Sequence, residues 1–275
     1  MLYDILVKPF VKNQSAEKAS KAALRYFRII NSIPGLRPFY RFIHGNKAAG
    51  MEREVFGIKF YNPVGLGAGL DLKGELYNDL NSLGFSFVEI GPLNAECTRA
   101  AVHNIQQEKP SDVLAACISS DFQTCFSLAY DFCDFFTIDV RNPNKLENIV
   151  NPLLDIRLTY DDYKPIVIKV PENCPEEELK RIVDYCLLYG IDGICTRSLK
   201  QTQYVYKLSD GRLAVIANSH IESEQQAQDL IDSGASLIEL RSGLVHKGPS
   251  FVRRVIQFLE NNVKNNVKRD SKQNQ

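Results

Sequence analysis

The sequence has no long apolar run. None of its hydrophobic stretches reaches the roughly 18 residues that a helix needs to cross a bilayer. Its first residues also lack a continuous hydrophobic stretch followed by a small-residue cleavage site, which is the pattern of a secretory signal. These absences argue against a membrane-spanning helix. They predict a cytoplasmic protein, with peripheral contact at the inner face of the cell membrane as the remaining membrane role.

The sequence also lacks CxxC pairs and metal-ligand spacings. Its seven cysteines are odd in number and mostly fall within apolar runs, as buried reduced thiols do. The four histidines show no spacing suited to a shared metal ion. We therefore expect neither a disulfide framework nor a zinc site, and no bound metal.

A net charge is absent too, since 33 Lys and Arg balance 33 Asp and Glu. A chain without positive net charge has no general attraction for phosphate backbones, and it carries no recognition motif, so a nucleic-acid partner is not expected. The charge is nevertheless uneven along the chain. Residues 1–53 carry a balance of +7 and the remaining residues a balance of −7.

From residue 62 onward, apolar strand-like runs alternate with amphipathic helical stretches. Helices are expected at 175–189 and 223–231, with a closing helix at 250–259. Eight strands with helical crossovers predict an α/β fold, a (β/α)8 TIM barrel over residues 54–263. A doubly wound open sheet is the alternative, but GLGAGLD matches its GxGxxG fingerprint poorly. The expected strands are 62–68, 85–90, 112–118, 135–140, 165–170, 191–196, 213–218 and 235–240.

Two intervals between strands lack a clear helical pattern. Residues 92–111 are polar and weakly periodic, and residues 199–212 are short and mixed. Both intervals follow strand ends, and in a barrel the loops after strand ends form the active-site face. We therefore expect loops there rather than helices.

Residues 1–53 form a separate unit in front of the barrel, and residues 264–275 a polar tail. A helix capped by Ser15 and running to about Asn31 would place small and aromatic residues on one side and basic residues on others. Such an element is either a helical cap packed on the barrel or an anchor on a membrane surface. Residues 1–45 are the candidate anchor.

The stretch from Asn62 to Gly91 contains the most informative turn. A strand-like run ends in Gly65, Gly67 and Gly69, so that backbone can lie against a flat ligand without Cβ atoms in the way. A helical stretch and a second buried strand follow. This pattern is typical of a cofactor site at the mouth of a barrel.

Several longer segments occur in a distinctive order. They are FGIKFYNPVGLGAGLD, LGFSFVEIG, PIVIKVPEN with PEEELKRIVD, YGIDGICT, and SGASLIELRSGLVHKGPSFVR. Together they resemble the quinone-linked (class 2) dihydroorotate dehydrogenases of pyrimidine biosynthesis, over nearly the whole chain. The resemblance implies FMN across the barrel mouth, dihydroorotate as substrate, quinone as electron acceptor and N-terminal helices that form a membrane-facing tunnel.

The resemblance also implies which residues hold the cofactor. In that family, backbone lies beside the flavin ring, later strands contribute a lysine and a threonine, and a turn after the last strand holds the phosphate through N–H groups. The matching positions are Ala68 and Gly69 at the ring, Lys169 and Thr196 on the later strands, and Ser242 and Gly243 at the phosphate turn.

Other positions depart from the family pattern. The catalytic serine position is Asn142, whose amide cannot accept a proton at neutral pH, and losing a positioned base typically costs about 10² to 10⁴ in rate. Leu72 replaces a lysine, Arg197 stands at a substrate-binding asparagine, and Arg241 replaces a tyrosine. The glycine-rich phosphate loop appears as residues 217–220, ANSH, without glycine.

Two hypotheses follow from these departures. If Asp139 replaces the missing base, the chain is an active FMN-dependent oxidoreductase that passes electrons from dihydroorotate or a related substrate to quinone. Alternatively, Asp139, Lys169 and Arg197 form a structural ion cluster in the former substrate space. The chain is then a divergent paralogue, a pseudoenzyme whose dihydroorotate oxidation is lost or strongly reduced. We favour this second hypothesis because several catalytic parts would otherwise have to be replaced together.

Overall fold

The computed structural model describes residues 16–31 and 50–273. It also describes seven single residues near the N-terminus, namely Tyr3, Val7, Pro9, Gln14, Ile33, Gly35 and Phe42. Ser15, the expected helix cap, and much of the candidate anchor segment 1–45 lie outside the described residues.

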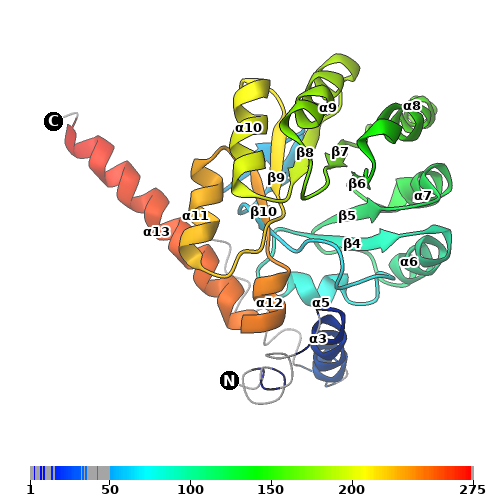
Figure 1. Ribbon diagram of the computed structural model, residues 1–275. Helices are drawn as coiled ribbons and strands as arrows, with labels where there is room; N and C mark the ends of the chain where they lie inside the picture. Colours follow the sequence, from blue (N-terminus) through cyan, green and yellow to red (C-terminus); the bar gives the residue numbers. More distant parts are fainter. Residues whose placement is uncertain are drawn as a thin grey trace.

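Eight parallel strands form a barrel (Figure 1). Their hydrogen-bonded order is β3-β10-β9-β8-β7-β6-β5-β4. The ring closes between β3 and β4, where Leu66 and Val88 form a parallel bridge. The predicted TIM barrel is therefore confirmed. The strands are β3 (Val64–Gly65), β4 (Phe87–Leu93), β5 (Val113–Ile118), β6 (Phe135–Asp139), β7 (Ile166–Lys169), β8 (Gly193–Thr196), β9 (Ala214–Ala217) and β10 (Leu237–Glu239).

Helices surround the barrel and cover the outer face of its strands (Figure 1). Those between strands are α5 (Tyr77–Asn81), α6 (Ala95–Gln107), α7 (Phe122–Ala129), α8 (Leu146–Arg157), α9 (Glu176–Tyr189), α10 (Leu199–Ser209) and α11 (Glu224–Asp232). Two short 3-10 turns precede or follow them, η1 (Tyr130–Phe132) and η2 (Pro143–Lys145). After β10 come α12 (Ser242–Lys247) and α13 (Pro249–Gln273). The last helix extends well past the expected end at residue 259 and projects away from the barrel (Figure 1).

The expectation of loops at 92–111 and 199–212 is wrong, because α6 and α10 occupy these intervals. Helix α6 shows why the pattern was missed. Its buried face consists of Thr98, Ala101 and Ile105, of which only the last is large and apolar. A start signal was present, since the Asn94 side chain accepts a hydrogen bond from the Cys97 backbone N–H at 2.8 Å.

The amino end of the barrel is closed by a hairpin, β1 (Arg53–Val55) and β2 (Ile58–Phe60). The ring of Phe60 lies 5.6 Å from that of Phe87 and 6.4 Å from that of Phe135, between ring centroids. Phe56 packs on Phe135 at 5.2 Å. Because Phe87 and Phe135 begin their strands, these aromatic rings fill the barrel interior at that end.

Helix α3 (Ala16–Asn31) packs its apolar face on the barrel. Ala19, Ala23 and Phe27 are buried in the main hydrophobic core together with Tyr3. The Tyr3 hydroxyl donates a hydrogen bond to the carbonyl oxygen of Val245 in α12. The apolar side of this amphipathic helix is therefore used in a cap on the barrel, which is one of the two roles expected for it.

Candidate active site at the barrel mouth

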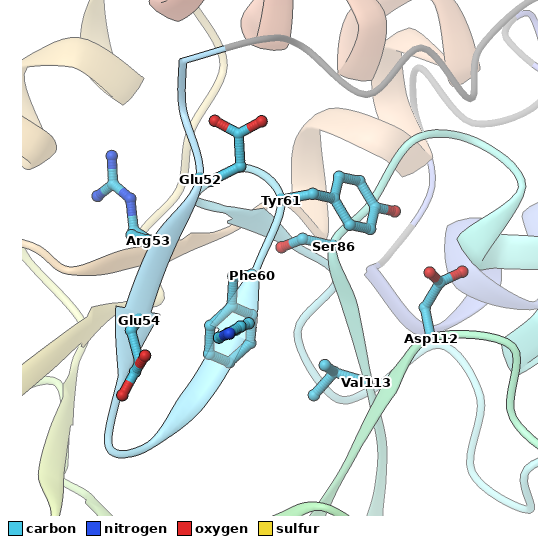
Figure 2. A pocket seen from close by; sticks show the side chains of 9 residues that line it. Glu52, Arg53, Glu54, Phe60, Tyr61, Ser86, Asp112 and Val113 are labelled. Atoms are coloured by element: carbon cyan, nitrogen blue, oxygen red, sulfur yellow. The ribbon is translucent and has the colours of Figure 1, made fainter.

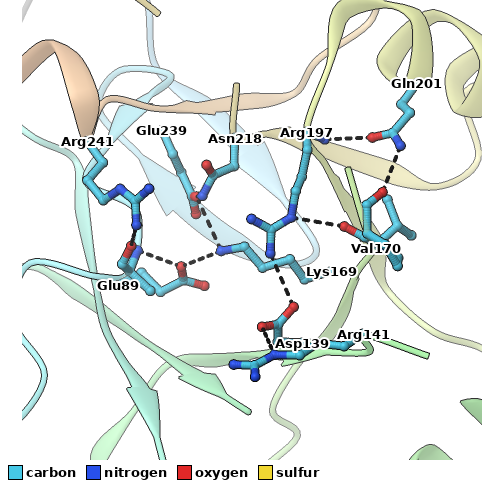
Figure 3. Close-up of polar contacts among 12 residues, drawn as sticks. Glu89, Asp139, Arg141, Lys169, Val170, Arg197, Gln201, Asn218, Glu239 and Arg241 are labelled. Atoms are coloured by element: carbon cyan, nitrogen blue, oxygen red, sulfur yellow. Dashed lines mark hydrogen bonds and ion pairs between the residues drawn. The ribbon is translucent and has the colours of Figure 1, made fainter. Parts of the chain in front are cut away.

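Three charged side chains meet inside the barrel near its mouth, the end at which the strands carry their carboxyl termini. Glu89, Lys169 and Glu239 each lie two positions after a residue of the inner apolar core, so the alternation of strand side chains directs all three inward. Nζ of Lys169 lies 3.1 Å from Oε2 of Glu89 and 3.8 Å from Oε2 of Glu239 (Figure 3). All three side chains are buried.

The charges of these groups are strongly coupled. Burial disfavours the ammonium form of Lys169, but the neighbouring carboxylates outweigh it and raise the pKa of Lys169 well above its ordinary value. Burial and the charge of Glu89 raise the pKa of Glu239 to about 7. One oxygen of each carboxyl group, Oε1, has no hydrogen-bond partner among the described residues. The cluster thus holds two acids for one lysine.

The backbone of Ala68, expected beside a flavin ring, is already engaged by side chains of the barrel. Its N–H donates to Oε2 of Glu89 at 2.8 Å. Its carbonyl oxygen accepts a hydrogen bond from Nη1 of Arg241 at 3.3 Å. Neither backbone group is left free for a ligand on this side of the mouth.

The glycines at the end of β3 accommodate the same set of side chains. A Cβ atom on Gly67 would lie 2.5 Å from Oε2 of Glu239 and 2.9 Å from Nδ2 of Asn218. A Cβ atom on Gly69 would overlap Nη1 of Arg241, and the φ angle of Gly69 is +112°. The absence of Cβ atoms, which the sequence suggested was for a flat ligand, lets side chains of the protein itself approach the backbone.

Asp139 forms a second ionic group beside the first. Its Oδ1 lies 3.2 Å from Nη2 of Arg197, and its Oδ2 lies 3.3 Å from Nε of Arg141 (Figure 3). Arg197 also donates from Nε to the carbonyl oxygen of Val170 at 3.1 Å. The expected cluster of Asp139, Lys169 and Arg197 is therefore present only in part. Lys169 turns instead to the two glutamates within the barrel.

Asn142, at the position of the family's base, is exposed and directly precedes η2. Its Oδ1 accepts a hydrogen bond from the backbone N–H of Asn144 at 3.1 Å. The side chain therefore acts as a cap on this short turn, a role that suits an amide and requires no proton transfer.

The remaining predicted residues lie at the end of β8 and, beyond β10, in α12, with β9 between these two strands. Thr196 is buried, and its hydroxyl lies 2.7 Å from that of Thr202 in α10. Ser242 and Gly243 begin α12, after β10. A Cβ atom on Gly243 would overlap the ring of Phe251, so this glycine is explained by helix packing.

Among the described residues, the hollow found at the mouth is small, with a volume of about 30 Å³. Pockets that enclose small molecules typically measure about 300–1,000 Å³. Arg241 also lies against the backbone of Ala68 and Gly69, where the flavin ring was expected. The residues at the mouth, as they are arranged in this structure, therefore do not fit FMN. The hollow is lined by Glu172, Arg197, Asn218, Ser219, His220, Arg241 and Ser242.

A larger hollow, of about 570 Å³, lies at the opposite end of the barrel beside the β1–β2 hairpin (Figure 2). Glu52, Arg53 and Tyr61 are among its lining residues, and none of the site residues expected from the sequence lines it. Among the described residues, no group of three or more His, Cys, Asp or Glu side chains is arranged to hold a metal ion. Within the same residues, no helix has the length and apolar character required to span a membrane.

Glu89 and Glu239 belong to this site but were not predicted from the sequence. Each is an acid within an otherwise apolar strand, in FVEIG and LIEL. A buried charge requires a partner, and Lys169 stands in a third such strand, IVIKV. This shared feature was the available signal.

Comparison with known proteins agrees with the fold and with the resemblance. No protein-family model matches the chain. A curated relative named dihydroorotate dehydrogenase (quinone), from Christiangramia forsetii, is 23% identical and covers 93% of this chain and 98% of its own length. A relative of the same name from Legionella pneumophila is 26% identical, with 92% of this chain and 98% of the relative covered.

The first of these alignments spans 334 residues, whereas this chain has 275, so the chain is shorter than its relative within the matched region. Among solved structures, DHODH from Eimeria tenella in complex with ferulenol superposes with a TM-score of 0.69 at 18% identity, covering 82% of this chain and 91% of that one. The ligand-free form gives 0.68. The chain is thus a divergent relative of the quinone-linked dihydroorotate dehydrogenases, built on their TIM-barrel fold.

Proposed function

We propose that this protein is a dihydroorotate dehydrogenase-like barrel in which dihydroorotate oxidation is lost or strongly reduced. The observation that carries the proposal is the state of the two candidate bases. Asn142 is an exposed amide that caps η2. Both oxygens of Asp139 are engaged by arginines, through Arg197 and Arg141. The amide of Asn142 is not basic at neutral pH, and the two arginine contacts hold the carboxylate of Asp139 in an ion pair rather than leaving it available as a base.

FMN is the cofactor to test, because the curated relatives carry the name of a quinone-dependent dehydrogenase. Lys169 is retained at the position that the resemblance assigns to the flavin. The position of Arg241 against Ala68 and Gly69 argues against FMN, as does the size of the hollow at the mouth. The barrel strands are retained, but the space at the mouth is too small for FMN, and this combination supports the interpretation as a pseudoenzyme.

The test is a turnover assay on the purified full-length chain with dihydroorotate, added FMN and a quinone analogue that changes colour on reduction. We expect no dihydroorotate-dependent reduction above the rate without protein. A dihydroorotate dehydrogenase of known activity, assayed in parallel, provides the positive control. Protein that is yellow, bleaches with dihydroorotate and regains its colour with the quinone analogue would contradict the proposal and establish the active alternative.

We further propose that the protein contacts anionic membrane surfaces from the side of α3, at the inner face of the cell membrane. The apolar face of α3 packs on the barrel, so its exposed side is the part available for a membrane. Lys18, Lys21 and Arg25 are exposed there. Clustered basic residues near a surface each contribute roughly 1 kcal/mol to binding at an anionic leaflet.

A further inference from the structure

The mouth of the barrel carries an arrangement that the loss of a catalytic base does not explain. Arg241 follows β10 and extends across to the end of β3, where Nη1 approaches Gly69 and bonds to the carbonyl oxygen of Ala68. A guanidinium group is planar, and it can cover a stretch of bare backbone much as a flat ligand does. Gly69 permits this approach because it has no Cβ atom.

The same strand supplies Glu239, two positions before Arg241. Glu239 is buried and shares Lys169 with Glu89, so the described interior contains one ammonium for two carboxyl groups. A buried charge without a counter-charge is costly. Burial and the charge of Glu89 raise the pKa of Glu239, and the positive charges of Lys169 and Arg241 oppose this rise.

Asn218 completes the arrangement from β9. Its Nδ2 donates to Oε2 of Glu239, and both atoms lie close to the backbone of Gly67 (Figure 3). Side chains of this chain therefore fill the space next to both Gly67 and Gly69. The two groups are linked through Ala68, whose N–H bonds to Glu89 and whose carbonyl oxygen bonds to Arg241.

We propose that Arg241 and Glu239 form a charge-matched pair that closes the barrel mouth, and that Arg241 is the residue that excludes a flavin ring from the backbone of Ala68 and Gly69. Exclusion of the flavin by Arg241 is independent of the loss of the catalytic base. Arg241 provides the covering group, and Glu239 provides the buried charge that makes an arginine favourable at this place.

The experiment uses four full-length proteins, which are the wild type, R241A, E239Q and the double variant E239Q/R241A. R241A removes the covering group and leaves a carboxylate in excess. E239Q removes one carboxylate and leaves the cover in place. The double variant removes both members of the pair, so the net charge at the mouth is unchanged. Circular dichroism and the melting temperature establish folding for each protein.

Flavin binding is measured by quenching of flavin fluorescence, with FMN and with riboflavin as separate probes. Riboflavin lacks the phosphate, so it reports on the ring site without requiring the altered loop 217–220. We expect the double variant to bind riboflavin, FMN or both at least tenfold more tightly than the wild type and E239Q. We also expect R241A to melt at a lower temperature than E239Q/R241A, because R241A leaves a buried carboxylate in excess and the double variant does not.

Three results would overturn the inference. The first is wild-type protein that binds FMN and riboflavin as tightly as the double variant does. The second is a folded double variant that gains affinity for neither probe. The third is a melting temperature of R241A equal to or above that of the double variant. Should R241A fail to fold, the double variant still decides the exclusion of the ring. Tight FMN binding by the wild type without dihydroorotate turnover would refute this inference and leave the catalytic proposal intact.

Discussion

Lys169 and Glu89 form an ion pair at the centre of the barrel, with Nζ 3.1 Å from Oε2. The same carboxylate oxygen accepts the backbone N–H of Ala68 at 2.8 Å. One glutamate thus connects the lysine of β7 to the end of β3 on the other side of the barrel. In this chain the lysine expected at a flavin has become part of the internal structure.

Replacing Lys169 by methionine should therefore destabilise the protein strongly. The variant K169M leaves Glu89 and Glu239 buried without an ammonium, and breaking a buried pair by removing one partner costs about 3–5 kcal/mol. Urea unfolding followed by circular dichroism measures the change. K180M is the matched control, since Lys180 forms an exposed pair with Asp184 and its loss should leave the unfolding midpoint unchanged. Equal midpoints for the two variants would refute the structural role of Lys169.

The pH dependence of stability should carry the signature of Glu239. Burial raises its pKa from 4.5 to about 7 in the folded state, so the folded protein binds the proton more tightly than the unfolded chain. Stability from this group is complete below pH 4.5 and is lost as pH rises towards 7, by about 3 kcal/mol. E239Q should therefore gain stability relative to the wild type as pH increases over this range.

The measurement is the free energy of unfolding of both proteins in urea at a series of pH values. E178Q is the control, because Glu178 lies on the surface of α9 in a pair with Arg181. A difference between E239Q and the wild type that stays constant with pH would show that Glu239 has no raised pKa.

Restoring the serine alone should not restore catalysis. N142S supplies the hydroxyl expected from the family pattern, but Arg241 still covers the backbone at Ala68 and Gly69. We expect no dihydroorotate-dependent reduction of a quinone analogue by N142S with added FMN. Appearance of that activity in N142S would show that the base was the one missing part.

The attachment of α3 to the barrel should contribute measurably to stability. Phe27 is buried in the main core, so F27A should cost about 3–5 kcal/mol through lost burial and a residual cavity. I29A provides a matched control on the same helix, because the side chain of Ile29 is 55% exposed. Equal unfolding midpoints for F27A and I29A would refute the cap role of this helix.

Charge reversal on α3 should release the protein from anionic vesicles. The variant K18E/K21E/R25E changes three exposed residues and leaves the buried face intact. Sedimentation with vesicles containing phosphatidylserine should fall at least tenfold and should be equally low for both proteins at high salt. A control with the same change in charge, K180E/K200E/K207E, alters exposed lysines of α9 and α10. Equal loss in both variants would refute a specific membrane face.

The barrel was predictable because its strands are short apolar runs bounded by polar segments. Helix α10 was not, since its buried residues Gln201, Thr202 and Ser209 are polar and only Val205 is apolar. Gln201 uses its amide to bond the carbonyl oxygens of residues 171 and 172 at 2.9 Å. A buried face built on hydrogen bonds leaves little hydrophobic periodicity in the sequence.

The sequence predicted the positions of the charged residues along the strands better than it predicted their ion-pair partners. The sequence placed Lys169, Asp139 and Arg197 at neighbouring strand ends, and the structure agrees. The direction of the side chain within the barrel decides which carboxylate a lysine contacts. Asp139 is in register with Lys169 on the adjacent strand, but this pairing does not determine the contact. Lys169 therefore meets glutamates from distant strands, although Asp139 is its neighbour in the sheet.

The aromatic rings at the amino end of the barrel affect the direction from which small ions can approach its interior. Phe60 and Phe135 pack across that end, whereas Arg197 and Arg241 line the hollow at the mouth, so an ion that approaches the buried acids from the mouth meets these two guanidinium groups first. Two fixed guanidinium groups repel metal ions and attract hydroxide and other small anions. Approach to the buried acid pair from the mouth is therefore less favourable for cations than for anions.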